Sequence, residues 1–361
     1  MLGLFSYKED SMAKPKYYEP TELLSKKDLD GEEPSIYLVT SNRSAGKTTA
    51  FLKLQLEDFK TYGKKAMLLY RQKYETRACS QIYSDVLRLY PEYGVEMKAE
   101  SRAEGLYYEM FLDGESFGYA CALNNPDQLK KYSPIFADVY NIVMDEFQTE
   151  SGKYLPKEVQ KLQSLLLTIA RGGGAQSRKV RVFLLGNMVS IMNPYFIYFN
   201  IHKRLKADTR FIRGNGWVAQ FEFNESASAA IKSNGIYKAF AKDDYMNYST
   251  ENVYLIDSEI FIQSPKGKSK YIYTIVHDDV KYGVREYFED GLIYVSRKVD
   301  NSCKQIVTFK ASNHTQNTIM LNHYSYLWKN IRDAFHGGFL RFDDIQSKNA
   351  IYDILAVDMY K

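Results

Sequence analysis

The chain has 361 residues, and its 48 Lys and Arg side chains against 44 Asp and Glu leave a formal net charge of +4. A chain longer than roughly 250–300 residues exceeds what one hydrophobic core usually serves, so two domains are expected. The apolar fraction of 45% and the charged fraction of 25% are those of an ordinary folded protein, which excludes a disordered or highly charged chain. A net charge this close to zero does not by itself indicate a nucleic-acid partner.

Cysteine placement and hydropathy exclude several further classes. Cys79, Cys121 and Cys303 lie far apart, so the sequence predicts neither a disulfide framework nor a zinc site and favours a reducing compartment. The apolar stretch at the N-terminus is too short for a signal peptide, and no apolar run reaches about 18 residues. We therefore expect no membrane-spanning helix and no membrane partner.

The first half of the chain alternates strand-like and helix-like segments. A polar arm with a short helix at 22–28 precedes strands at 36–40 and 66–70, which are followed by helical patterns at 47–62 and 80–90. A hairpin with strands at 106–112 and 117–123 turns at Asp113-Gly114, and a strand at 140–144, a helix at 156–171 and a strand at 180–185 follow. Strands that alternate with helices predict an α/β fold with a largely parallel sheet.

The pattern changes after about Lys206. Residues 206–250 hold one strand-like run at 211–223 and one helical run at 227–240, which predicts a small connector. Beyond it, strand-like runs lie at 271–276, 283–288, 292–296 and 305–310, and helical runs at 322–335 and 347–359. Strands followed by helices favour an α+β or RNase H-like domain. The predicted domains are therefore 1–205, 206–250 and 251–361.

The strongest motif lies between the strand at 36–40 and the helix that begins at Lys47. It comprises Ser41, Asn42, Arg43, Ser44, Ala45, Gly46, Lys47, Thr48 and Thr49. A strand–loop–helix with Gly-Lys-Thr at the helix start predicts a phosphate loop that binds ATP, because backbone amides and the helix N-terminus attract phosphate oxygens. Lys47 would contact the β- and γ-phosphates, and the Thr48 hydroxyl would bind Mg²⁺. Ser41 stands where the usual pattern has glycine, and the alternative is a chance Gly-Lys-Thr at a helix start.

Two adjacent acids follow the strand at 140–144. Asp145 is suited to hold Mg²⁺, and Glu146 is suited to orient and deprotonate an attacking water. With a strand and a hairpin between the two motifs, the pattern indicates the branch of P-loop ATPases that has an additional central strand and a catalytic glutamate (ASCE). The alternative is an exposed acidic pair that merely ends a strand.

Four more side chains are candidates with two interpretations each. Asn187, at the end of the next strand, is either a sensor of the γ-phosphate and the attacking water or a simple turn residue. Arg171, which precedes three glycines, either enters a neighbouring subunit's site or stabilises its own helix C-terminus. Arg71 and Lys73 follow the strand at 66–70 and are either surface charges or contacts to phosphate or DNA.

Several segments together resemble one family. The stretches 145–147, 154–159, 182–187 and Asn193-Pro194-Tyr195-Phe196 are similar to the DNA-packaging ATPases of small podoviruses, which are relatives of the large terminases of tailed bacteriophages. The resemblance covers the first two hundred residues well and the remainder mostly by layout. It implies that Lys47, Thr48, Asp145 and Glu146 are the family's phosphate-loop and acidic residues. It also implies that Arg171, or Arg178 if the alignment shifts, is the arginine that acts on the neighbouring subunit, and more weakly that Lys73 acts across that interface.

The resemblance also implies partners and a place of action. Such proteins form a homomeric ring, usually a pentamer, on the portal of a procapsid, and ATP hydrolysis drives double-stranded DNA into the shell. A packaging RNA is an open question. The protein would act in the host cytoplasm, transiently at the portal vertex, and would be absent from the mature virion.

The C-terminal third has its own expectations. The resemblance implies an RNase H-like domain that has usually lost nuclease activity. A two-metal nuclease needs three or four carboxylates that converge at strand ends, whereas the acids here fall mainly in apparent turns, with Asp278 or Asp279 the best remaining candidate.

Two basic clusters are candidates for DNA contact, with exposed surface charge as the alternative. They consist of Lys203, Arg204, Lys206, Arg210 and Arg213, and of Lys266, Lys268 and Lys270. Tyr17 and Tyr18 are candidates to stack on the adenine. The rival functions are a terminase with an active nuclease, a helicase or recombination ATPase that acts on DNA, and a scaffold with an inactive phosphate loop.

Overall fold

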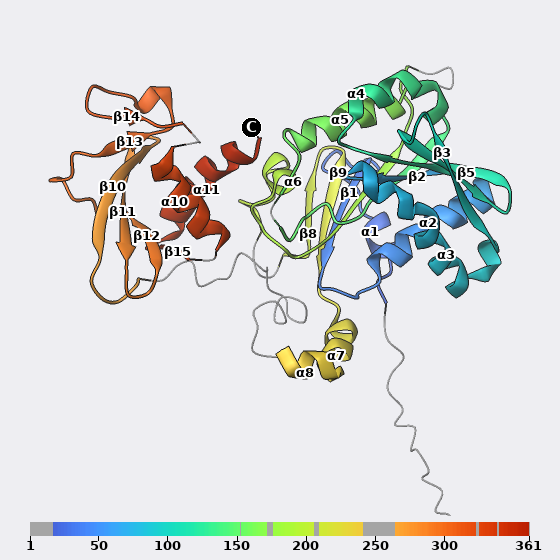
Figure 1. Cartoon of the computed structure of the whole chain (residues 1–361), viewed down its shortest axis with the longest axis horizontal. Coiled ribbons are helices and arrows are strands. Elements are labelled where there is room, and N and C mark those ends of the chain that lie inside the picture. The colour runs from blue at the N-terminus through green and yellow to red at the C-terminus, as the bar shows by residue number, and fades with distance from the viewer. Residues whose placement is uncertain are drawn as a thin grey trace, which may run out of the picture.

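A computed structural model shows two sheets, each covered by helices (Figure 1). It describes residues 17–151, 153–171, 176–205, 209–240, 264–322, 325–337 and 339–360. The last part of the predicted connector, residues 241–250, lies outside the described residues.

The first sheet contains nine described strands in the order β3-β4-β5-β2-β6-β7-β1-β9-β8. They are β1 (Ile36–Ser41), β2 (Lys65–Tyr70), β3 (Met97–Arg102), β4 (Tyr107–Leu112), β5 (Glu115–Ala122), β6 (Val139–Met144), β7 (Arg181–Asn187), β8 (Phe211–Gly214) and β9 (Trp217–Glu222). From β5 to β9 the neighbouring strands run parallel, and antiparallel strands β3-β4 and β8 extend the two edges. The predicted parallel α/β sheet is confirmed.

Both faces of the first sheet are buried, which explains its continuous apolar strands. Tyr37 and Val39 of β1 belong to the core beneath α2 and α3, whereas Leu38 between them belongs to the core beneath α5 and α6. Successive side chains of a strand point to opposite faces, so one run of apolar residues supplies both cores. The helices on the two faces are α2 (Lys47–Tyr62), α3 (Cys79–Leu89), α4 (Pro126–Leu129), α5 (Glu158–Ile169) and α6 (Pro194–Tyr198).

Shorter helical segments complete the first part of the chain. They are α1 (Thr21–Leu24), α7 (Glu225–Ser233) and α8 (Gly235–Phe240), with 3₁₀ turns η1 (Lys73–Ala78), η2 (Pro91–Tyr93) and η3 (Lys130–Phe136). The helix expected at 22–28 is therefore only one turn long.

One sequence-based expectation about the first sheet is wrong. The predicted boundary at residue 205 cuts the sheet, because β9 pairs in parallel with β1 and β8 pairs with β9. The strand that lies between β1 and β6 is β7, which follows both motifs in the chain. Strand order depends on long-range packing that residue periodicity does not encode.

The second sheet is mixed and has the order β14-β13-β10-β11-β12-β15 among the described residues. Its strands are β10 (Lys270–His277), β11 (Val280–Tyr287), β12 (Leu292–Ser296), β13 (Ile306–Thr308), β14 (Ile319–Met320) and β15 (Leu340–Phe342), with the 3₁₀ turn η5 (Ala311–Asn313) between β13 and β14. Strands β10, β11 and β12 form an antiparallel meander, and β13 lies parallel to β10. Helices α10 (Tyr326–His336) and α11 (Ile345–Tyr360) supply most of the helical side of its core.

Helix α6 joins the two parts of the molecule (Figure 1). It contacts α5 beside the first sheet and α11 beside the second. Met192 and Ile197 belong to the core of the second sheet, and Lys203 forms an ion pair of 2.5 Å with Asp353 of α11. None of the helices in the described part of the chain is long and apolar enough to span a membrane.

Candidate functional site

The loop between β1 and α2 bends through two positive φ angles, 59° at Ser44 and 90° at Gly46. Gly46 is the residue directly before α2, where a side chain would be strained, and its left-handed conformation turns the chain into the helix. Lys47 then opens α2 with its side chain buried against the end of β1. The local sequence therefore forms the strand–loop–helix geometry expected of a phosphate loop.

The Lys47 ammonium group is held at the carboxyl ends of β1 and β7. It donates to Ser41 Oγ at 2.7 Å, to the Asn42 carbonyl at 3.3 Å and to Asn187 Oδ1 at 3.2 Å. Ser41 and Asn187 are direct neighbours in the parallel pairing of β1 with β7. Burial lowers the pKa of Lys47 to about 8, partly opposed by the nearby Asp145 carboxylate. Ser41, which departs from the usual glycine, thus supplies a hydrogen-bond acceptor to the lysine.

A second link fixes the loop from the other side. The Asn42 side chain accepts from the backbone N–H of Asn224 at 2.8 Å and donates to the Asn224 carbonyl at 3.1 Å. Asn224 in turn caps α7 by accepting from the Ala227 N–H. The position of the loop is therefore coupled to the segment that leaves the first sheet.

The acids after β6 face the loop. Asp145 Oδ2 accepts from Thr48 Oγ1 at 2.7 Å, and its other oxygen accepts from the Glu146 N–H. Asp145 is exposed as a residue, but the protein atoms around its carboxylate exclude part of the solvent. This desolvation raises the pKa of Asp145 above the usual range, although the hydrogen bond from Thr48 opposes the shift. Desolvation, followed by the charge of Asp145, also raises the pKa of Glu146. A hydroxyl and a carboxylate in contact offer the oxygen ligands that Mg²⁺ prefers.

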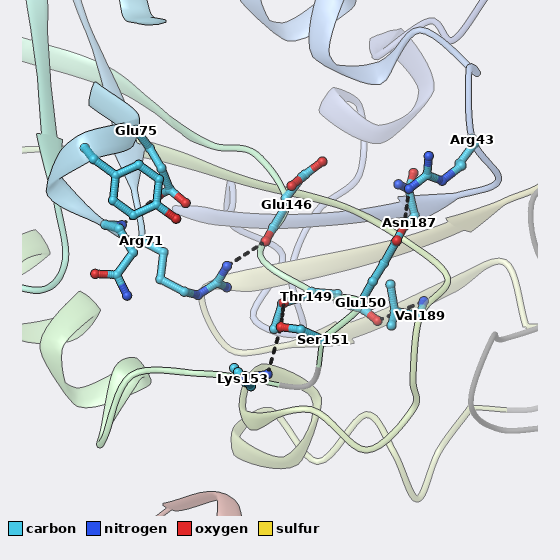
Figure 2. Close-up of a pocket in the computed structure, with 13 residues that line it drawn as sticks. Arg43, Arg71, Glu75, Glu146, Thr149, Glu150, Ser151, Lys153, Asn187 and Val189 are labelled. Atoms are coloured by element: carbon cyan, nitrogen blue, oxygen red, sulfur yellow. Dashed lines mark hydrogen bonds and ion pairs between the residues drawn. The ribbon is translucent and has the colours of Figure 1, made fainter. Parts of the chain in front are cut away.

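Glu146 lines a pocket of about 420 Å³ together with Asn187, Arg43 and Arg71 (Figure 2). Its backbone adopts a positive φ of 54°, which directs the residue out of the strand direction of β6. Arg43, from the loop, forms an ion pair with Glu150. The candidate residues Lys47, Thr48, Asp145, Glu146 and Asn187 are thus brought together at one edge of the sheet, whereas Thr49 continues α2.

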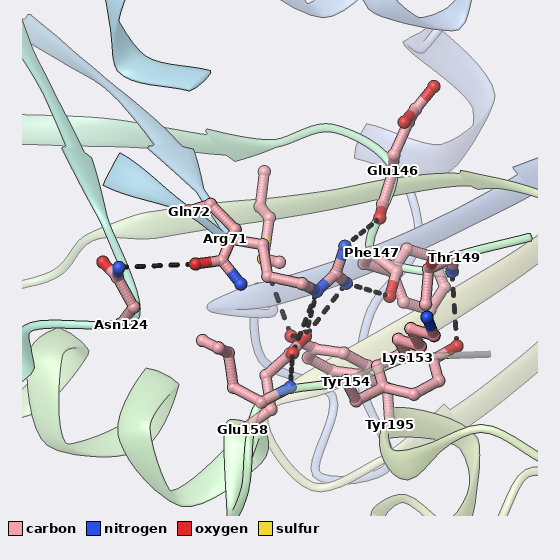
Figure 3. Close-up of polar contacts among 12 residues, drawn as sticks. Arg71, Gln72, Asn124, Glu146, Phe147, Thr149, Lys153, Tyr154, Glu158 and Tyr195 are labelled. Atoms are coloured by element: carbon pink, nitrogen blue, oxygen red, sulfur yellow. Dashed lines mark hydrogen bonds and ion pairs between the residues drawn. The ribbon is translucent and has the colours of Figure 1, made fainter. Parts of the chain in front are cut away.

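Sequence reasoning missed a buried network below this pocket. Arg71 Nε lies 2.9 Å and Nη2 3.0 Å from the two carboxylate oxygens of Glu158, whose side chain is fully buried (Figure 3). Glu158 also accepts from Tyr195 Oη at 2.8 Å and from the Leu155 N–H. The Arg71 guanidinium donates further to the carbonyls of Glu146, at 3.3 Å, and Phe147, at 2.9 Å.

This network corrects both interpretations of Arg71, which is neither a surface charge nor free to bind a phosphate in this structure. The guanidinium instead supports the backbone that carries Glu146. Burial disfavours its charge, but the bonds and the charge of Glu158 hold the pKa of Arg71 above its usual range. Lys73 is a separate case, because it donates to the Glu104 carbonyl at 3.1 Å on a neighbouring surface.

The two arginines proposed to act on a neighbouring subunit have different surroundings. Arg171 is exposed just after α5. Arg178 is partly buried, and its guanidinium donates to the carbonyls of Phe136 at 2.9 Å and Ile169 at 2.7 Å and to that of Val139. Arg178 is therefore engaged within its own chain.

The tyrosines of the N-terminal arm also differ. Tyr18 is 3% exposed, packs against Phe51 and donates to Gln220, so its predicted stacking on the adenine is wrong. Tyr17 is 63% exposed and lies against the loop, with its Cδ1 3.2 Å from the position of a Cβ at Gly46. Tyr17 remains a candidate for contact with a nucleotide.

The basic clusters are only partly available. Lys203 pairs with Asp353, Arg210 pairs with Glu22, and Arg204 lies over the Trp217 ring and donates to a carbonyl. Lys206 lies outside the described residues. Arg213 is exposed, as are Lys266, Lys268 and Lys270. DNA contact by either cluster stays a prediction.

The acids of the second sheet do not converge in the described part of the chain. Asp278 and Asp279 have positive φ angles of 49° and 62° and form the turn between β10 and β11. Asp278 pairs with Lys310, and Asp279 accepts from Asn313. No group of three His, Cys, Asp or Glu side chains that could hold a metal ion is found among the described residues.

Fold and site define a mixed α/β protein in which a lysine, a hydroxyl, two acids and an amide meet at the carboxyl ends of parallel strands. Residues 12–359 match the family described as Podovirus DNA encapsidation protein (Gp16), and the chain belongs to this family. The expected resemblance to the packaging proteins of podoviruses is thus confirmed.

Individual relatives extend over nearly the whole chain. The chain is 26% identical over 347 residues to the DNA packaging protein of Bacillus phage phi29, which covers 95% of this chain and 98% of the relative. It is 26% identical over 331 residues to the DNA packaging protein of Bacillus phage B103, covering 90% and 95%. A solved structure of the bacteriophage Phi-29 viral genome packaging motor assembly contains a chain of similar fold, with a TM-score of 0.55 at 24% identity, over 96% of this chain and 100% of that chain.

Proposed function

We propose that this protein is an ASCE-type P-loop ATPase that works as a homomeric ring and drives double-stranded DNA into a procapsid. The observation that carries the proposal is the convergence of Lys47, Thr48 and Asp145 with Glu146 and Asn187 at one sheet edge. This arrangement has the parts that phosphoryl transfer to water requires: a phosphate cradle, a metal ligand pair and a base.

The site residues divide the chemistry among them. The backbone amides of residues 42–48 and the Lys47 ammonium would bind the triphosphate, and Thr48 and Asp145, whose oxygens lie 2.7 Å apart, would hold Mg²⁺. Mg²⁺, when bound, neutralises charge between the β- and γ-phosphates. Glu146 would accept the proton of the attacking water, and Asn187 would orient that water and the γ-phosphate.

The setting of the motor follows from the family. The partners would be the portal of a procapsid, double-stranded DNA and further copies of the same chain, in the host cytoplasm and only while the shell is filled. Basic residues around a ring add up along its channel, so a chain of charge +4 can still hold DNA phosphates.

A packaging reaction tests the proposed function. Purified protein, procapsids, linear DNA and ATP are expected to yield DNA that survives added DNase, and ADP should accumulate in proportion to the DNA protected. Omission of ATP or Mg²⁺ should leave all DNA digestible. Protection of DNA that does not depend on ATP would contradict a motor, and unwinding of a forked duplex would favour the helicase alternative.

We also propose that the C-terminal domain is RNase H-like and has lost nuclease activity. The antiparallel meander β10-β11-β12 with β13 added in parallel beside β10 supports this fold. The turn positions of Asp278 and Asp279 and their pairing with Lys310 and Asn313 support the loss of activity. Plasmid incubated with the protein and Mn²⁺ should stay supercoiled, whereas linear product would favour a terminase with an active nuclease.

The surroundings of the two arginines support Arg171 as the residue that acts on the neighbouring subunit. Arg171→Ala should lower ATP turnover in assembled rings by about 10³-fold or more, as expected for an arginine finger, and should leave the thermal midpoint unchanged. Arg178→Ala leaves buried carbonyls without a donor, so it should lower the thermal midpoint by several degrees.

Mixed rings separate the roles. Arg171→Ala subunits mixed with Lys47→Ala subunits should recover part of the activity, because a Lys47→Ala subunit can supply its arginine to a neighbour with an intact phosphate loop. A mixture that forms rings but stays inactive would show that Arg171 does not act between subunits.

A further inference from the structure

Gln148 follows Asp145 and Glu146 closely in the chain, and its side chain is buried, with the residue 3% exposed. Its side-chain carbonyl accepts from two successive backbone amides of the segment after β7, those of Val189 at 3.2 Å and Ser190 at 3.1 Å. Both donors are N–H groups, so the oxygen of the Gln148 amide must face them and its amino group must face away. The chemistry therefore fixes the orientation of this side chain.

The amino group of Gln148 is buried and has no hydrogen-bond partner among the described residues. Buried donors are normally paired, and an unpaired one raises the free energy of the state that contains it. Gln148 also lines the pocket that contains Glu146 and Asn187. A rotation of this side chain toward the pocket would offer its unpaired donor to an oxygen acceptor bound there.

The two amides held by Gln148 belong to a segment that leads to the second sheet. Ser190 accepts, through its carbonyl, from Asn193 Nδ2 at 2.8 Å, and Asn193 Oδ1 caps α6 by accepting from Tyr195 and Phe196 N–H groups. Met192 and Ile197, on either side of this cap, are buried in the core of the second sheet. A displacement of residues 189 and 190 would therefore also move the start of α6, which packs against the C-terminal domain.

We propose that Gln148 is a positioning residue that responds to the nucleotide. Its carbonyl holds the Val189 and Ser190 amides, and its amino group turns toward an oxygen of the nucleotide or of its attacking water, which releases these amides. The proposal rests on the proposed function, because it takes the ligand of the pocket to be a nucleoside triphosphate. It makes the segment 188–193 a two-state link between the ATP site and the C-terminal domain.

Two substitutions separate the acceptor from the donor of Gln148. Gln148→Met has similar length but neither group, and Gln148→Glu keeps the acceptor oxygens and, when ionised at pH 8, lacks the donor. Gln55→Met is a matched control, because Gln55 is also a fully buried glutamine bonded to two backbone groups, the carbonyls of Met67 and Asn141, but lies away from the pocket.

Hydrogen–deuterium exchange of the full-length protein, resolved to the amide of Ser190, is the main measurement, with and without Mg²⁺ and ATPγS. The Val189 N–H also donates to the Asn187 carbonyl at 2.9 Å, so the Ser190 amide reports on Gln148 more directly. In the wild type and in the control Gln55→Met, the Ser190 amide should exchange slowly without nucleotide and at least about tenfold faster with it, because its hydrogen bond to Gln148 is then broken. The Ser190 amide should exchange fast in both conditions in Gln148→Met, and slowly in both conditions in Gln148→Glu.

ATP turnover gives a second measurement. Gln148→Met should lower kcat by about tenfold to a hundredfold with little change in KM. The substitution displaces catalytic groups but leaves the residues that bind the nucleotide in place. Gln55→Met should lower the thermal midpoint and keep kcat near the wild-type value, which distinguishes positioning from a general loss of stability.

Each outcome bears on the proposal. Slow exchange of the Ser190 amide in Gln148→Met without nucleotide would refute the positioning role, and a wild-type response in Gln148→Glu would refute the role of the donor. If a fluorescent ATP analogue does not bind the wild type, the proposed function fails. The comparison of wild type with Gln148→Met in the absence of nucleotide still decides whether Gln148 holds the segment.

Discussion

Glu146→Gln is expected to abolish DNA packaging and to lower ATP turnover by roughly 10²–10⁴-fold, the usual contribution of a general base. Glu146 lies at the end of β6, beside the Thr48–Asp145 contact, and lines the same pocket as Asn187. Glutamine keeps the size of the side chain and removes its ability to accept the proton of water. Nucleotide affinity should therefore stay within about threefold of the wild type, because Lys47 and the loop amides remain.

Turnover and binding must be measured separately to test this expectation. ADP release reports kcat, and displacement of a fluorescent ATP analogue reports affinity. Asp145→Asn is the informative comparison, because loss of a metal ligand should weaken Mg²⁺-dependent binding as well as turnover. Glu92→Gln, an exposed acid on η2, should change neither quantity. A Glu146→Gln protein that hydrolyses ATP at half the wild-type rate would show that another group is the base.

The pH dependence gives an independent check of the same residue. Desolvation, Asp145 and Glu150 together raise the pKa of Glu146, so its carboxylate takes up a proton at a higher pH than an ordinary glutamate. The base is active when ionised, and kcat should therefore fall as the pH drops through this raised pKa. Glu150→Gln removes one neighbouring negative charge, so the acid limb of the kcat profile should move to lower pH. An acid limb that stays in place would exclude this coupling.

Local elements of the first domain could be predicted from the sequence because their signals are local. Apolar runs bounded by turn residues gave strands at 36–40 and 140–144, and the structure has Ile36–Ser41 and Val139–Met144. Gly46 and Lys47 mark the start of α2, since a left-handed residue must precede the helix there. The same local logic placed Asp145 beside Thr48, because the carboxyl ends of parallel strands share one edge of a sheet.

The remaining features depend on partners that lie far apart in the chain. Strand β9 pairs with β1, which lies about 180 residues earlier in the chain. Arg71 pairs with Glu158 across 87 residues. The one available signal was Glu158 itself, an acid in the first turn of a helix whose following residue, Val159, begins the apolar stripe. A single sequence does not show which cation such a buried acid meets.

The support beneath Glu146 leads to the second large effect. Arg71→Met should destabilise the first domain by about 3–5 kcal/mol, because it leaves the carboxylate of Glu158 buried without its cation. Replacing both residues, as Arg71→Met with Glu158→Leu, should cost less than Arg71→Met alone, since the double variant buries no unpaired charge. Arg88→Met is the matched control, because Arg88 and Asp85 form an exposed pair on α3 that should contribute less than about 1 kcal/mol.

The two tryptophans allow this test to report on one domain at a time. Trp217 lies in β9 of the first sheet and Trp328 in α10 beside the second, so urea unfolding in a Trp328→Phe background follows the first domain by the fluorescence of Trp217. The double-mutant cycle gives the coupling energy of the pair. Arg71 also holds the carbonyls of Glu146 and Phe147, so the stabilised double variant should remain slow in ATP turnover. Full activity in the double variant would mean that the ion pair serves the fold and that other contacts position the catalytic glutamate.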